Sequence, residues 1–204
     1  LIQDSIIAAV YLTLRDTFLT KSQYSELLYQ STSSLLEDKP KNSRLFLLEP
    51  AIQKPKRFWT GKQLISNIIK VIVALAGPEY KNQKGLNMKS ASCIPPSAIY
   101  GNASDESTVR VVDNELVQGM IDKNQIGSGF TFGLVHSFNE LYGYKMTGQL
   151  QTCLTKLFSN YLQLHGFSCG IDDLILTRKS DKNRVTGLEG AFDHAVKNIS
   201  QFLN

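Results

Sequence analysis

The sequence has only three cysteines, and they lie far apart. Cys93, Cys153 and Cys169 form no C-x-x-C pair, and no histidine stands near them at the spacing of a zinc ligand. This odd, scattered set argues against a disulfide framework and predicts small, buried thiols in a reducing compartment. The chain opens at Leu1 on an apolar stretch without a basic lead-in, so no signal peptide is predicted and a fragment of a longer protein is expected.

Long apolar runs and a strong charge of one sign are also missing. The longest run, residues 68–76, is interrupted by Lys70, whereas a helix needs ~20 apolar residues to span a bilayer. No membrane partner is therefore expected. The chain has 22 Lys and Arg against 18 Asp and Glu, a net charge of +4, which permits a nucleic-acid neighbour without requiring one. Its 204 residues, 42% of them hydrophobic, are enough to bury a core.

Acidic residues are absent between Pro50 and Pro78, and cations gather at the start of this interval. Residues 49–63, which we call the strap, read E-P-A-I-Q-K-P-K-R-F-W-T-G-K-Q and contain two prolines and the only tryptophan. The prolines fix their own backbone and favour extended neighbours, so the strap should be stiff. Its four cations are Lys54, Lys56, Arg57 and Lys62.

A helix is predicted to begin at the end of the strap. Thr60 is a typical N-cap, and Gln63 would complete a capping box. Apolar residues follow at helical spacing and define one buried face: Leu64, Ile65, Ile68, Ile69, Ile72 and Val73. A helix N-terminus carries a partial positive charge, so cations beside it are unfavourable unless an anion such as a phosphate chain approaches. The alternative is a solvated basic loop before a core helix.

The whole pattern predicts an α+β fold that is mostly helical, with a β-hairpin and short strands. Residues 2–14 fit a helix or a buried strand, and a helix capped by Asp16 or Thr17 should run to Tyr29. Further expectations are a loop over 31–42, a short strand over 45–48, a loop insert over 77–107, a hairpin of 108–112 and 116–121, helices over 132–141, 147–165 and 188–203, and a turn over 170–174.

Other polar groups are weak candidates for chemistry. Asp172 and Asp173 could form a metal or acid–base pair, but adjacent carboxylates point in alternating directions and more often cap the following segment. His136 lies on an apolar helix, where a hydrogen-bonded structural histidine is expected. The loop Gly127-Ser128-Gly129 lacks the Lys-Ser/Thr that follows in a phosphate-binding loop. No metal site and no self-contained active site are predicted.

Four blocks of sequence carry a family resemblance. They are L-I-Q-D leading to L-R-D-T-F-L at 14–19, P-A-I-Q-K-P leading to W-T-G-K-Q at 59–63, residues 115–123 followed by G-L-V-H at 133–136, and G-F-S-C-G-I-D at 166–172. In this order and spacing the chain resembles the pore region and the start of the funnel of the largest subunit of multi-subunit DNA-directed RNA polymerases.

Two longer stretches are most similar to the polymerase I form, which transcribes ribosomal RNA precursor. They are G-L-V-H-S-F-N-E-L-Y-G at 133–143 and G-I-D-D-L-I-L-T at 170–177. Two departures concern the strap: Lys54-Pro55-Lys56 resembles the polymerase II form, and Arg57-Phe58 stands where Pro-Leu is usual.

The resemblance implies a fragment of a larger subunit, with a pore domain over 1–176 that includes a variable insert at 77–107, and the start of the funnel helices over 177–204. In such subunits the catalytic Mg²⁺ is held by aspartates of an upstream motif that is absent here, so no catalytic residue is expected in this segment of a nucleotidyltransferase. The segment would line the channel through which nucleoside triphosphates enter and backtracked RNA 3′ ends leave.

The implied partners are the other polymerase subunits, including the second-largest, RNA and nucleoside triphosphates, the DNA template through the whole enzyme, and a transcript-cleavage factor or subunit. The implied location is the nucleus, in particular the nucleolus. Lys54, Lys56 and Lys62 are the residues expected nearest to RNA or triphosphate, followed by Arg57. The alternative is a non-catalytic scaffold module whose helices and hairpin bind other polymerase subunits, with the strap merely solvated.

Overall fold

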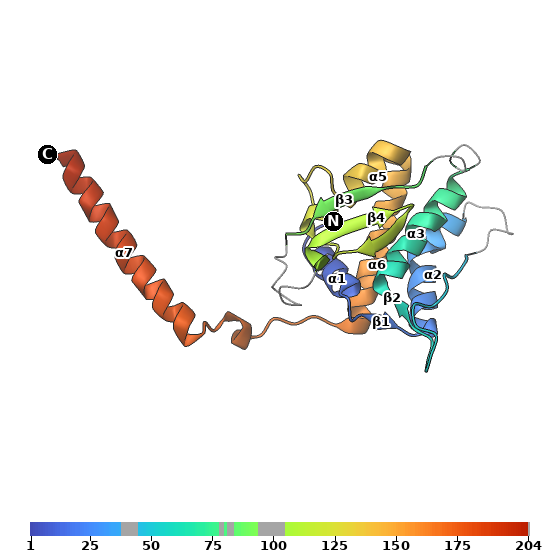
Figure 1. The fold of residues 1–204 in the computed structure, drawn as a ribbon, viewed down its shortest axis with the longest axis horizontal. Helices are drawn as coiled ribbons and strands as arrows, with labels where there is room; N and C mark the ends of the chain where they lie inside the picture. Colours follow the sequence, from blue (N-terminus) through green and yellow to red (C-terminus); the bar gives the residue numbers. More distant parts are fainter. Residues whose placement is uncertain (38–44, 78–79, 81–83, 94–104, 204) are drawn as a thin grey trace. The chain divides into compact units, whose positions relative to one another are not determined.

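A computed structural model describes residues 1–37, 45–77, 80, 84–93 and 105–203. The chain divides into two compact units, Leu1–Gly166 and Phe167–Asn204. Helices predominate, and the described strands form two small antiparallel sheets (Figure 1). The predicted α+β class is confirmed.

The first unit is built around one long helix, α6 (Tyr144–His165). Four other helices pack on it: α1 (Asp4–Thr13), α2 (Lys21–Glu37), α3 (Gly61–Ala76) and α5 (Leu134–Tyr142). The buried side chains of α6 repeat at helical spacing and form one apolar stripe along the helix. They include Leu150, Cys153, Leu154, Leu157, Phe158 and Tyr161. They form the centre of a single hydrophobic core.

Two sheets complete this unit. Strand β1 (Phe18–Leu19) pairs with β2 (Trp59–Thr60), which joins the end of the strap to the segment before α2. The second sheet has the order β3 (Met88–Ala91), β4 (Thr108–Val112), β5 (Glu115–Gln118). Its inner face is buried through Val109, Val111 and Leu116, and β5 contacts α3. Short helices flank it at Asp105–Ser107 and at α4 (Lys123–Ile126).

Several local predictions are confirmed. Residues 4–13 are helix, α3 has the predicted capping box, and the hairpin forms around Asp113 and Asn114. Both turn residues have positive φ angles, 49° and 65°, the geometry of a type I′ turn, which suits their short polar side chains. Helices α5 and α6 lie where periodicity placed them, although α6 begins three residues earlier than Thr147, and Gly166 is its C-cap.

Other local predictions are wrong. The helix expected from Asp16 or Thr17 begins at Lys21, because residues 18–19 pair as a strand, and it continues to Glu37 through much of the predicted loop. Residues 45–48 form no strand. Within the predicted loop insert, residues 88–91 form β3; residues 78–79, 81–83 and 94–104 of that insert, and 38–44 of the predicted loop over 31–42, lie outside the described part.

The cysteines differ from one another. Cys153 is buried in α6, as predicted, and its burial raises the pKa of this thiol to about 11. Cys93 and Cys169 are exposed, so the prediction of buried thiols is wrong for these two. Cys93 lies at an exposed bend two residues after the end of β3.

The second unit contains a short 3-10 helix, Ile171–Leu174, and the long helix α7 (Arg178–Leu203). The helix predicted from Leu188 thus begins ten residues earlier. Thr177 accepts a hydrogen bond from the backbone N–H of Ser180, at 3.3 Å, which fits a helix start at Arg178. Among the described residues, no helix combines the length and apolar character that crossing a membrane requires.

Candidate functional site

The start of α3 gives the strap a fixed base. The Thr60 hydroxyl accepts from the Gln63 backbone N–H at 3.2 Å, and the Thr60 N–H donates to the Gln63 side-chain oxygen at 3.1 Å, so the predicted capping box is confirmed. Gly61 lies against α1: a Cβ at this position would be 1.9 Å from the carbonyl oxygen of Leu12. Only glycine lets the two backbones approach this closely.

Three side chains hold residues 46–49, where the chain enters the strap. The Trp59 indole N–H donates to the carbonyl of Leu48 at 2.7 Å, and the Gln63 amide donates to the carbonyl of Glu49 at 2.9 Å. The Asn67 amide donates to the carbonyl of Phe46 at 3.0 Å. Side chains of β2 and α3 thus take the place of a partner strand at the carbonyls of Phe46 and Leu48.

A buried tyrosine connects these contacts to α2. The Tyr24 ring stacks on the Trp59 indole, with ring centres 5.6 Å apart, and its hydroxyl accepts from the Asn67 amide at 2.9 Å. The same hydroxyl lies 3.4 Å from the carbonyl of Gln63, to which it donates. Burial raises the pKa of Tyr24 to about 12, against the lowering effect of the Asn67 hydrogen bond, so the hydroxyl stays a neutral donor at physiological pH.

The strap itself folds back as a tight hairpin. Ile52 and Phe58 exchange two backbone hydrogen bonds, at 3.1 and 2.9 Å, and the strap then enters β2. The strap is therefore not extended throughout, because its two strand-like ends pair with each other. Its tip carries Lys54, Lys56 and Arg57, all exposed and none with an ion pair to a described residue. The structure thus brings these three predicted site residues together.

Lys62 is in a different environment. Its ammonium lies 2.5 Å from the Glu106 carboxylate, and the two side chains are only 13% and 15% exposed. A carboxylate that is distant in sequence therefore offsets a charge that the sequence left without a local partner. Sequence reasoning missed Glu106 because no local pattern links it to the strap.

The remaining predicted residues have structural contacts. The Asp173 carboxylate accepts from the Gly170 backbone N–H at 2.8 Å and so closes the turn that both acids occupy, while the backbone carbonyl of Asp172 accepts from Ile175 N–H at 3.4 Å. His136 is half-buried and meets the edge of the Phe132 ring at 6.0 Å. This aromatic contact is a structural role for His136.

The described residues offer no donor set that fits a magnesium site. Among the described residues, no three His, Cys, Asp or Glu side chains gather in a way that could hold a metal ion. Asp122 is a buried carboxylate, but its oxygens already accept from Ser92, from the Cys93 N–H and from the Asn124 N–H. The last of these bonds makes Asp122 the N-cap of α4.

Comparison with known proteins assigns the chain to a family. Residues 1–174 match the family described as RNA polymerase Rpb1, domain 3. The chain is 37% identical to DNA-directed RNA polymerase I subunit rpa1 of Schizosaccharomyces pombe, over all of this chain and 11% of that protein. It is 37% identical to the subunit of the same name from Dictyostelium discoideum, over 99% of this chain and 12% of that protein.

A relative from another polymerase is less similar. The identity to DNA-directed RNA polymerase III subunit RPC1 of Homo sapiens is 28%, over 85% of this chain and 12% of that protein. The chain thus spans about a tenth of the length of the curated relatives that it matches. It belongs to the RNA polymerase Rpb1, domain 3 family, and its sequence is more similar to these polymerase I largest subunits than to that of polymerase III.

Proposed function

We propose that this chain is the part of an RNA polymerase I largest subunit that lines the pore and funnel, where nucleoside triphosphates enter and backtracked RNA 3′ ends leave. The observation that supports this most directly is the tip of the strap. Three exposed cations, without ion pairs in the described part of the chain, project from a hairpin whose base is fixed by hydrogen bonds. Such a group attracts the phosphates of a nucleic acid whatever its base sequence, because the cations contact the charged backbone and not the bases.

The chemistry of nucleotide addition would be supplied elsewhere in the subunit. The described residues hold no cluster suited to Mg²⁺, so we assign the metal to another part of the full subunit and derive no catalytic step from this segment. The polymerase would act on a DNA template in the nucleolus to make ribosomal RNA precursor. The other subunits, the second-largest among them, and a transcript-cleavage factor or subunit are its proposed partners.

The test uses the assembled polymerase with Lys54→Ala/Lys56→Ala/Arg57→Ala in this subunit. Lys62 is left intact because its charge is already paired with Glu106. We expect a nearly unchanged maximal elongation rate, weaker retention or slower cleavage of backtracked RNA, and a flatter salt dependence, since each phosphate contact contributes about one unit to the salt slope. A matched control is Lys21→Ala/Lys123→Ala/Lys145→Ala, which removes three exposed cations from α2, α4 and α6.

The outcome separates the two functions that the sequence left open. If the salt slopes of elongation and cleavage are the same for both triple variants and the unmodified enzyme, the strap is only a solvated face. The segment would then be the non-catalytic scaffold module that binds other polymerase subunits. The channel function would be supported if the control variant keeps the salt slopes of the unmodified enzyme while the strap variant has flatter ones.

A further inference from the structure

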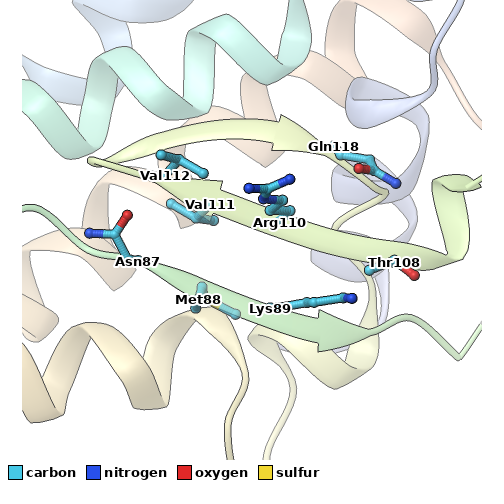
Figure 2. A pocket seen from close by; sticks show the side chains of 8 residues that line it. All are labelled: Asn87, Met88, Lys89, Thr108, Arg110, Val111, Val112 and Gln118. Carbon is cyan, nitrogen blue, oxygen red and sulfur yellow. The ribbon is translucent and has the colours of Figure 1, made fainter.

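The outer face of the sheet β3-β4-β5 is uncovered in the described part of Leu1–Gly166. Along β4, exposed and buried residues alternate, so that Val109 and Val111 face the core while Arg110 and Val112 face outward. A hollow of about 760 Å³ lies over this face, and Figure 2 shows the side chains that line it, with Arg110 on the middle strand between Lys89 of β3 and Gln118 of β5.

This face carries an unopposed positive charge. Lys89 and Arg110 are direct partners in the β3–β4 register, and like charges at such positions are destabilising. Both side chains are exposed, and neither forms an ion pair with a described residue. The carboxylate of Glu115 on β5 is already engaged by Lys70 of α3. An anion placed over the two cations would therefore remove an electrostatic cost that the free sheet bears.

The chemistry of the hollow favours a peptide over a nucleic acid. The apolar side chain of Val112 stands beside the two cations, and none of the described residues that line the hollow is aromatic, so a base would have no ring to stack on. Two cations are also few for a surface that follows a phosphate backbone. A carboxylate, by contrast, pairs with the arginine fork through two parallel hydrogen bonds, while neighbouring apolar residues of the same peptide can cover Val112.

The occupant would lie across the face and not add a strand to the sheet edge. At the outer edge of β3, the carbonyl of Ala91 already accepts from the side-chain amides of Asn124 and Gln125, both at 3.2 Å. These bonds close the edge to a new strand at that end. The face itself remains available: Lys89 and Arg110 are exposed, and Val112 is 38% exposed.

We propose that this face, defined by Lys89, Arg110 and Val112, is the docking surface for an acidic, extended segment of another polypeptide of the polymerase. The proposal rests on the chain being part of a polymerase subunit and is independent of the phosphate-binding function of the strap. The docked segment would have Asp or Glu residues that contact Arg110 and Lys89, flanked by apolar residues that contact Val112.

The experiment uses the assembled polymerase with a photoreactive benzoylphenylalanine in place of Val112, followed by mass spectrometry of the crosslinked peptides. We expect a crosslink to a peptide of another subunit that contains acidic residues next to the crosslinked position. In the same enzyme, Lys89→Glu/Arg110→Glu should lower the crosslink yield about tenfold or more, since two charge-assisted contacts become repulsions. The control Lys21→Glu/Lys145→Glu makes the same change in charge on α2 and α6 and should leave the yield unchanged.

Each other result overturns the proposal. Crosslinks only to nucleic acid would assign the face to DNA or RNA, and crosslinks only within this subunit, or none, would show that no partner docks there. If charge reversal prevents assembly, Lys89→Gln/Arg110→Gln takes its place, and an unchanged yield in that variant excludes a charge-directed contact. The strap variant Lys54→Ala/Lys56→Ala/Arg57→Ala should retain the crosslink, so failure of the channel function and failure of this docking surface are distinguishable.

Discussion

The base and the tip of the strap carry cations in contrasting states. At the base, Lys62 is largely buried and paired with Glu106, whereas at the tip Lys54, Lys56 and Arg57 are exposed and have no ion pair in the described part. All four belong to one basic stretch of sequence. The difference shows that a cation can be part of the scaffold or available to a ligand, and that tertiary pairing decides which.

The contacts around the base restrain the backbone of the strap, although the side chains at its tip are exposed. The capping box, the Trp59–Leu48 hydrogen bond and the backbone pair Ile52–Phe58 restrain both ends of the hairpin. Three like charges are thereby kept close together on a restrained backbone. Preorganisation of this kind would lower the cost of binding the proposed phosphate ligand, because that ligand need not order the loop.

The largest expected effect comes from the backbone contact at the base. Gly61→Ala would place a Cβ 1.9 Å from the Leu12 carbonyl oxygen, so α1 or α3 must move. We expect a loss of about 3 kcal/mol or more in the free energy of unfolding, at the upper end of overpacking costs. Urea denaturation of the 204-residue chain measures it.

A second helical glycine provides the control for this prediction. Nothing lies within 4 Å of a Cβ built at Gly148 in α6, so Gly148→Ala should be neutral or stabilise by up to ~1 kcal/mol through helix propensity. Equal effects of the two substitutions would contradict the close approach of Gly61 to α1.

The next effect tests the paired state of Lys62. Glu106→Gln leaves the ammonium largely buried without its carboxylate and should cost about 2 kcal/mol. Lys62→Met/Glu106→Gln should recover most of this loss, because no unpaired charge remains, and a double-mutant cycle by urea denaturation gives the coupling. Lys70→Met is the comparison, since its pair with Glu115 is more exposed and should contribute less than ~1 kcal/mol. A coupling no larger for the Lys62 pair than for the Lys70 pair would refute the contrast between the paired base and the unpaired tip of the strap.

This contrast also shows what the sequence could and could not predict. The capping box of Thr60 and Gln63 was predictable because its two residues are close in sequence and their interaction is local. The same holds for the hairpin turn and for the long apolar period of α6. The cluster of exposed cations at the tip was predictable as a composition, although its hairpin shape was not, because the Ile52–Phe58 pairing has no distinctive residue pattern.

The rest depended on contacts between distant segments. Strand β3, Met88–Ala91, lacks alternating apolar residues and exists because β4 offers it a partner. The Lys62–Glu106 pair and the Tyr24–Asn67 hydrogen bond each join positions more than 40 residues apart. No period or motif encodes such pairs, so the sequence by itself does not reveal them. The family resemblance, by contrast, was recognisable from short blocks, and the comparisons confirm it.

A smaller effect is expected at the N-cap that joins the strap to α3. Thr60→Ala removes the oxygen that accepts from Gln63 N–H and should cost about 1 kcal/mol of unfolding free energy. Thr60→Ser keeps that oxygen and should stay within ~0.5 kcal/mol of the unmodified chain. Thermal and urea denaturation measure both variants, and equal losses for Ala and Ser would show that the hydroxyl is not the source of the stability.

The smallest effect is expected at the tip, where the variant Lys54→Gln/Lys56→Gln/Arg57→Gln removes three charges. These side chains are exposed and have no ion pair with a described residue, so the free energy of unfolding should change by less than ~0.5 kcal/mol. The direction should be towards stability at low salt, because neighbouring like charges repel, and added salt should remove the difference. Urea denaturation at two salt concentrations measures this, with Glu106→Gln as the variant of opposite expectation.

A loss above ~1 kcal/mol at the tip would mean that these cations stabilise the fold, and the contrast between base and tip would fail. A neutral result, together with altered retention of backtracked RNA in the assembled enzyme, would mean that the three charges serve binding and not stability.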